Sequence, residues 1–395
     1  MMKRVQKIFF LVAFVSGIFL ISCQREDVLV GLGIDDVYSI ERMTTLVLHP
    51  EYTGDAYVWT MLLDDGRDSI VGTERDYIFC AADTGTYYLH LEIVDEENPV
   101  SHDIKIVVWQ EQVAYSRYIS KVYEYRPAPG QFVNVLPQYD AGNSAADMAL
   151  KAQNAIANNA HGMISLGAFG GYVTFGFDHS VVNVAGERDF TVLGNAFYAT
   201  SNAHPERGQA GNSEPGIVMV AVDQNKNGQP DDPWYELAGS AYHNADTKHH
   251  YQITYFRPDD AQTVTDSTYI RWTDNLGGSG YVARNSFHQQ DYFPLWLGDS
   301  ITFSGTLLPK NGYQENGTWL LYAYDWGYAD NHPNDSTDLV SFDIDWAVDE
   351  AGQSVYLPCI DFVRVYTAVN QTCGWIGETS TEISGAEDLH ISAKK

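Results

Sequence analysis

Short apolar stretches separated by Gly, Asp and Asn turns run through most of this sequence, and they limit what it can fold into. Alternation with a period of two residues is typical of strands with one buried face, and closely spaced turns join such strands into antiparallel sheets. Eight or more β-like runs follow residue 170: GYVTFGF, FTVLGNAF, GIVMVAV, YQITYF, SITFSGTLL, WLLYAYDW, LVSFDIDWAV and IDFVRVYTAV. We therefore expect an all-β protein. Since no repeat of fixed period appears, a jelly-roll-type sandwich is favoured over a propeller.

One segment has a helical pattern, GNSAADMALKAQNAIANN. Ser144 or Asn143 can cap its start, residues 145–157 are good helix formers, and Asn158 with Asn159 can end it. The sequence thus predicts one short helix in an otherwise β-rich chain.

Two domains are expected, because about 370 residues after the targeting segment exceed what one core usually holds. Residues 34–112 read as short strands, and a linker, YEYRPAPGQFVN, begins the larger region 113–395. The stretches AYVWTMLLDDGRDS and ADTGTYYLHLEIVD resemble PKD-type (polycystic kidney disease repeat) immunoglobulin-like domains. That resemblance implies a β-sandwich spacer with Trp59 as its buried aromatic residue.

The N-terminus has a basic start, an apolar run over residues 8–21 that is short for a membrane-spanning helix, and then Leu20-Ile21-Ser22-Cys23. This end resembles a bacterial lipobox, which implies that residues 1–22 are a signal peptide, Cys23 carries lipid and 23–33 form a tether. An ordinary signal peptide with an incidental cysteine is the alternative. The QRED that follows resembles the signal that sends lipoproteins of Bacteroides-type bacteria to the cell surface, so we expect an outer-membrane anchor with the protein facing outward.

The chain is strongly acidic, with a formal net charge of -29. Such a charge repels nucleic acid and anionic lipid, so neither nucleic-acid binding nor peripheral adsorption is expected. Membrane attachment must then come from the lipid anchor alone.

The stretch VDQNKNGQPDDPWYEL matches part of a calcium-loop template. The template places Asp223, Asn225 and Asn227 at alternating ligand positions, Gly228 at the turn, the Gln229 carbonyl next, and Asp231 after it. Trp234 stands where an EF-hand has its bidentate Glu, so that ligand must come from Asp232, Glu236 or a remote residue. We expect a structural Ca²⁺, while a loop that only satisfies its own backbone is the alternative.

No HExxH, GxSxG or P-loop spacing occurs, so we expect no catalytic residues. His249 and His250 should point to opposite faces of a strand and thus not share a metal. Cys80 is expected to be a buried inert thiol, and whether Cys359 and Cys373 form a disulfide stays open.

Aromatic residues in Gly-, Asn- and Asp-rich loops are the candidate ligand-binding residues, because such rings can stack on a sugar or a planar macrocycle. The alternative is that each one only fills the core. The candidates are Trp234, Tyr235, Trp272, His288, Tyr292 and Trp296.

Residues 115–385 also resemble a family of bacterial cell-surface proteins. The stretches that carry the resemblance include SLGAFGGYVTFGFDHSVVN, SEPGIVMVAVDQNKNGQPDDPWYELAGS, FHQQDYFPLW and FDIDWAVDEAGQSVYLPCIDFVRVYTAVN. Related surface lipoproteins accompany TonB-dependent transporters, and some similar sets accompany corrinoid (vitamin B12) uptake. The resemblance implies a non-catalytic protein that binds a glycan or corrinoid for uptake. A calcium-stabilised glycan hydrolase and an adhesion protein are the alternatives.

Overall fold

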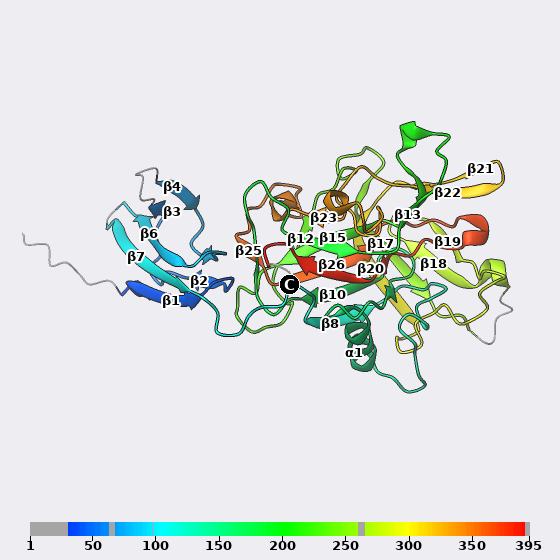
Figure 1. The fold of residues 1–395 in the computed structure, drawn as a ribbon, viewed down its shortest axis with the longest axis horizontal. Coiled ribbons are helices and arrows are strands. Elements are labelled where there is room, and N and C mark those ends of the chain that lie inside the picture. The colour runs from blue at the N-terminus through cyan, green and yellow to red at the C-terminus, as the bar shows by residue number, and fades with distance from the viewer. Residues whose placement is uncertain (1–30, 63–67, 97, 260–264, 392–395) are drawn as a thin grey trace, which may run out of the picture.

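The computed structural model describes residues 31–62, 68–96, 98–259 and 265–391. The signal peptide, Cys23 and most of the expected tether lie outside these residues. In the described part the chain is all-β with one α-helix, as the sequence predicts (Figure 1). Within these ranges no helix is long and apolar enough to cross a bilayer.

The N-terminal unit is a small β-sandwich, drawn blue to cyan in Figure 1. Trp59 is fully buried in its core, as expected, where its ring stacks on Tyr77 at 5.2 Å and its N–H donates to the Glu74 carbonyl at 2.9 Å. The five-stranded sheet has the order β1 (Val37–Glu41), β7 (Val100–Trp109), β6 (Gly85–Val94), β3 (Ala56–Leu62) and β4 (Ser69–Gly72), and the second sheet pairs β2 (Leu46–Leu48) with β5 (Tyr77–Phe79).

The larger C-terminal unit begins with β8 and is built around a six-stranded antiparallel sheet. The placement of the domain boundary at residue 112 stays a prediction. The central sheet has the order β24 (Ala347–Val348), β16 (Tyr235–Leu237), β15 (Gly216–Ala221), β26 (Phe362–Thr367), β10 (Tyr172–Gly176) and β8 (Lys121–Arg126).

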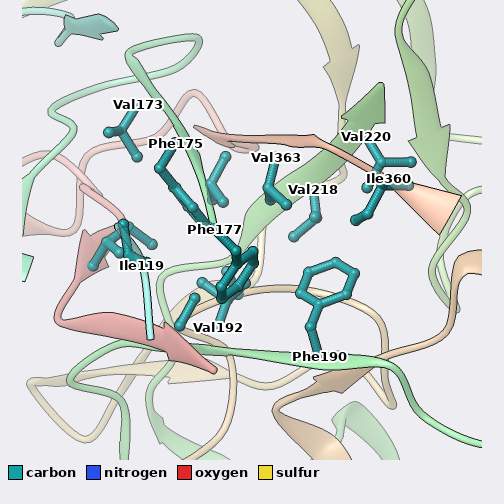
Figure 2. Close-up of a cluster of buried hydrophobic side chains, with 14 of the residues drawn as sticks. Ile119, Val173, Phe175, Phe177, Phe190, Val192, Val218, Val220, Ile360 and Val363 are labelled. Atoms are coloured by element: carbon teal, nitrogen blue, oxygen red, sulfur yellow. The ribbon is translucent and has the colours of Figure 1, made fainter. Parts of the chain in front are cut away.

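Both faces of this central sheet are covered, which explains why GIVMVAV is apolar without alternation. On one face, Val218 and Val220 of β15 pack with Val363 of β26 against Phe190 (Figure 2). On the opposite face, Ile217 packs with the four-stranded sheet that contains Ile253 and Phe303. The expected sandwich therefore has a third layer.

The remaining strands form further sheets of the C-terminal unit. The four-stranded sheet that packs on the central sheet has the order β19 (Ser279–Val282), β18 (Ile270–Asp274), β17 (Lys248–Phe256) and β20 (Ser300–Leu307). A three-stranded sheet has the order β23 (Ser341–Phe342), β12 (Phe190–Leu193) and β28 (Gly385–Asp388), and another four-stranded sheet has the order β13 (Phe197–Tyr198), β14 (Ala210–Asn212), β22 (Thr318–Tyr322) and β21 (Gly312–Glu315). Two strand pairs join β11 (Val181–Val182) to β25 (Cys359–Ile360) and β27 (Glu382–Ile383) to β9 (Ile164–Ser165).

The expected helix is α1 (Ala145–Ile156), which lies beside β8 (Figure 1). A capping box begins it: the Asp147 N–H donates to the Ser144 hydroxyl at 3.2 Å, and the Ser144 N–H donates to the Asp147 carboxylate at 2.8 Å. The helix ends at Ile156 because its C-cap, Ala157, is extended (φ -86°, ψ 161°). Asn158 and Asn159 follow in the left-handed region with φ of 53° and 58°.

The two units touch through the strand pair β11–β25. The Thr45 and Ser180 hydroxyls are 2.8 Å apart, and Met43 packs against Val182. Cys80 of the N-terminal unit hydrogen-bonds to Cys359, and this bond together with burial raises the pKa of the Cys80 thiol. Cys80, Cys359 and Cys373 are all free thiols, so Cys359 and Cys373 form no disulfide.

Candidate functional site

The 223–232 loop joins β15 to β16 and folds around its own carboxylates. The Asp223 carboxylate accepts the backbone N–H groups of Asn227 at 3.1 Å and Gly228 at 2.9 Å. Gly228 has φ +68°, which an L side chain rarely adopts, so the glycine permits the sharp turn. The turn directs the side chains that follow back toward Asp223.

Hydrogen bonds bring four of the six expected ligands together within this loop. The side-chain amides of Asn225 and Asn227 donate to the Asp231 carboxylate at 2.9 and 3.0 Å, and these bonds lower the pKa of Asp231. Asp223 joins them through its bond to the Asn227 N–H. The Gln229 carbonyl instead accepts the Asp231 N–H at 2.9 Å, so it turns toward the backbone.

Asp232 is the strongest candidate for the missing bidentate ligand. Burial, and then the charges of Asp223 and Asp231, raise the pKa of its carboxyl, and its Oδ2 has no hydrogen-bond partner within the described part of the chain. Glu236 is excluded from this role because it accepts the Thr306 hydroxyl at 2.7 Å and lines a separate cavity. The carboxylate oxygens of Asp223, Asp231 and Asp232 suit a hard cation such as Ca²⁺. The amide oxygens of Asn225 and Asn227 instead accept the N–H groups of Asn227 at 3.0 Å and Gln229 at 2.7 Å, which is also the geometry of a loop that satisfies its own backbone.

The aromatic candidates do not form one patch. The ring centroid of Trp234 lies 4.3 Å from the guanidinium carbon of Arg364. The Trp296 ring stacks between Tyr125 and Tyr139, with 5.9 Å between ring centroids in each pair. Tyr235 and Trp272 are half-buried, each against one of the two hydrophobic clusters of the C-terminal unit. The expectation of a solvent-facing ring is wrong for Tyr292, which is fully buried in the core, where its hydroxyl donates to the His288 carbonyl at 3.0 Å. Of the six aromatic candidates, His288 alone lines the cavity that residues 131–136 and 375–382 help to form.

That cavity, called the carboxyl cavity here, has a volume of about 620 Å³. Six segments line it: residues 131–136 after β8, Met163, Asn195, residues 212–214 at the end of β14, the loop 285–288, and the segment 375–382. Its lining combines exposed rings, Trp375 at 61 % and Phe287 at 77 % exposed, with the buried carboxyls of Glu214, Glu378 and Glu382. An apolar rim over a polar floor is the general form of a small-ligand site.

The floor of the carboxyl cavity holds unusual charges. Burial raises the pKa of Glu378 to about 8 and that of Glu214 to about 7. Burial and then the charge of Glu214 also raise the pKa of Glu382 and of the adjacent Asp330. Among the described residues no Lys, Arg or His forms an ion pair with any of the four.

Backbone and side-chain donors hold these carboxyls in place. Glu378 Oε1 accepts the Gln131 N–H at 2.6 Å, and Glu214 accepts the Asn212 amide at 2.9 Å. Glu382 accepts the Ser380 hydroxyl at 3.0 Å. Sequence reasoning missed this floor because no spacing rule links residues 214, 330 and 382. The only signal was the pair of Glu residues inside the small-residue stretch GETSTEISG.

A second cavity of about 430 Å³, called the His249 cavity here, lies between β16 and β17. Burial raises the pKa of Glu236 to about 7 there and lowers that of His249. The expectation that His249 and His250 face opposite sides is wrong: a β-bulge at His250, with φ 54°, lets both residues line this cavity.

Comparison with known proteins gives only distant similarities. No family model matches the chain, and no curated protein matches it. Among solved structures, a SusE-like protein is 7 % identical with a TM-score of 0.28, over 90 % of this chain and 96 % of that one. A structure of carbohydrate-binding modules from the β-sandwich superfamily, described as promiscuous in specificity, is 10 % identical with a TM-score of 0.15, over 88 % of this chain and 94 % of that one. Scores this low do not establish a shared fold, so function must be inferred from the site.

Proposed function

We propose that this chain is a surface-exposed lipoprotein that binds a glycan in the carboxyl cavity without turning it over. The observation that carries the proposal is the pairing of exposed Trp375 and Phe287 rings with a floor of amides and carboxyls, Glu378 among them. A sugar presents apolar C–H faces to aromatic rings and hydroxyls to polar groups, so it matches both surfaces.

The anchoring part of the proposal rests on the sequence. Lipid on Cys23 and the QRED that follows would place the protein on the outer membrane facing outward, where a TonB-dependent transporter is the expected partner. The N-terminal unit would act as a spacer between the anchor and the cavity. A Ca²⁺ in the 223–232 loop, bound through Asp223, Asn225, Asn227, Asp231 and Asp232, would stiffen the C-terminal unit.

One observation favours a glycan hydrolase as the second candidate. A carboxyl whose pKa is near 7 or 8, as at Glu214 and Glu378, can serve as a general acid. Glycosidases keep their two carboxyls at least about 5 Å apart. Carboxylate oxygens of Glu214 and Glu382 lie within 4.8 Å of each other, which is just below that separation, so this pair matches a glycosidase less well than a polar floor for a bound ligand. Binding is the function that we propose.

Calorimetry of the purified mature chain against plant and host glycans, cobalamin and cobinamide tests the proposal. Trp375→Ala should weaken glycan binding by about 1–2 kcal/mol, roughly 5- to 30-fold in Kd, because an exposed stacking ring is lost. Tyr356→Ala is the matched control, since this ring is similarly exposed (65 %) and lines neither cavity.

Three results would count against the proposal. If Trp375→Ala bound glycan with unchanged affinity, the carboxyl cavity would not be the glycan-binding site. Binding of cobalamin or cobinamide alone would replace the glycan with a corrinoid. Release of shorter sugars during the titration would establish the hydrolase.

A further inference from the structure

Three buried carboxyls from separate parts of the chain converge below the carboxyl cavity. Glu214 lies between β14 and β15, Asp330 follows β22, and Glu382 begins β27. They are 7 %, 1 % and 5 % exposed, and one carboxylate oxygen of each lies within 4.8 Å of the others. Glu214 and Glu382 also line the cavity, so the cluster can be reached from solvent.

The protein supplies no positive charge to this cluster within the described residues. Like charges this close in a buried site repel strongly, so the group needs either shared protons or a bound cation. Asp330 is placed as an acceptor only: its Oδ1 accepts the N–H groups of Asn195 at 2.6 Å and Ala196 at 2.8 Å, and its Oδ2 accepts that of Glu382 at 2.9 Å. These three N–H donors favour the ionised form of Asp330 and oppose the burial and the charge of Glu214, which raise its pKa.

Two further groups in the same cavity have no partner. Glu378 Oε2 and Gln131 Oε1 form no hydrogen bond to any described residue, although the two side chains are only 3 % and 6 % exposed. Both residues line the cavity beside Glu214 and Glu382. A buried polar atom left unpaired is costly, so these oxygens point to a bound group that forms hydrogen bonds with them.

We propose that Glu214, Asp330 and Glu382 bind a Ca²⁺ ion at the floor of the carboxyl cavity. The donors are all oxygens, with no His or Cys, as a hard cation prefers. Calcium takes six to eight oxygens at about 2.4 Å, so two ligands on opposite sides of the ion stand about 4.8 Å apart. Three carboxylates leave further coordination positions for water, whose hydrogens can be donated to Glu378 and Gln131.

The open side of the ion faces the cavity, where hydroxyls of a bound sugar could replace those waters. This last step rests on the proposed function, whereas metal binding by the three carboxyls does not. The two can therefore fail separately.

Calcium titration of the metal-free full chain tests the site. The background is Asp223→Ala, which removes the key carboxylate of the 223–232 loop. This variant should still bind one Ca²⁺, and adding Glu382→Gln or Glu214→Gln should weaken that binding at least 100-fold. Glu350→Gln is the control, because Glu350 is an exposed carboxylate in the His249 cavity and its loss should leave binding unchanged.

A second measurement covers variants that do not fold. Crystals of Asp223→Ala soaked with Mn²⁺ should show an anomalous peak between the three carboxyls. Absence of that peak, or calcium binding that survives in both Gln variants, would overturn the proposal in favour of carboxyls that share protons. Bound Ca²⁺ without glycan binding would refute only the function, and glycan binding that is unchanged by chelator would refute only the bridging role of the ion.

Discussion

Replacement of Glu236 by Gln should remove a pH dependence from the stability of the C-terminal unit. Glu236 is half-buried on β16 in the His249 cavity, where burial raises the pKa of its carboxyl from 4.5 to about 7. Among the described residues, the Thr306 hydroxyl is the only group that donates a hydrogen bond to this carboxyl. Because the folded pKa lies above the unfolded one, the folded state holds the proton more tightly. The resulting stability is complete below pH 4.5 and is lost as the pH rises through 7.

The size of the effect follows from the two pKa values. A rise from 4.5 in the unfolded chain to about 7 in the folded protein corresponds to about 3 kcal/mol. Gln keeps a neutral side chain of the same shape that still accepts the Thr306 hydroxyl. The variant should therefore match the wild type near pH 4.5 and exceed its free energy of unfolding by about 2–3 kcal/mol at pH 8.

Urea unfolding of both proteins from pH 4.5 to 8, followed by tryptophan fluorescence at fixed calcium, gives this difference directly. Other carboxyls with raised pKa values, such as Glu378, cancel when the two curves are subtracted. Glu350→Gln, which changes an exposed carboxylate in the same cavity, is the matched control variant. A constant difference between Glu236→Gln and the wild type across this range would refute the burial argument.

Three further outcomes are expected. Chelator should lower the Tm of the wild type, because an ion bound only by the native state adds about 1–3 kcal/mol at 10- to 100-fold excess over Kd. Asp223→Ala should abolish the part of the calcium response that comes from the 223–232 loop. Equal responses in both proteins would mean that the loop binds no ion and only satisfies its own backbone groups. Cys23→Ala should move the protein from the membrane fraction to the soluble fraction, and continued membrane fractionation would contradict lipidation. Peptide mapping without reduction should find no peptide that joins Cys359 to Cys373, and recovery of that cross-link would contradict the free thiols of the structure.

Local patterns predicted the elements well because their causes are local. The capping box at Ser144, the helix end shortly before Asn158 and the burial of Trp59 each depend on residues a few positions apart or on one strand pattern. The third layer was not predicted. A continuous apolar run such as GIVMVAV indicates burial on both faces, but it does not say which segment covers each face.

The candidate site was predicted only where it is contiguous in sequence. The loop around Asp223 could be read from alternation and one glycine, whereas the carboxyl cavity joins segments more than 160 residues apart. For a related reason, the sequence could not tell which aromatic candidates are buried and which line a cavity. Tyr292 and His288 stand in the same loop, yet the hydroxyl of Tyr292 turns inward to bond with backbone, and no sequence pattern separates such a ring from one that faces solvent.

The position of the 223–232 loop argues that a metal there would hold structure rather than perform chemistry. Lys226 donates from this loop to the Thr45 carbonyl of the N-terminal unit. The Asp223 N–H donates to Asp361 at 2.8 Å, and the same carboxylate accepts the Ser180 hydroxyl at 2.6 Å at the contact between the units. None of these residues lines the carboxyl cavity. An ion that fixed the loop would thus stabilise the contact between the N-terminal and C-terminal units, apart from the proposed cation site of Glu214, Asp330 and Glu382.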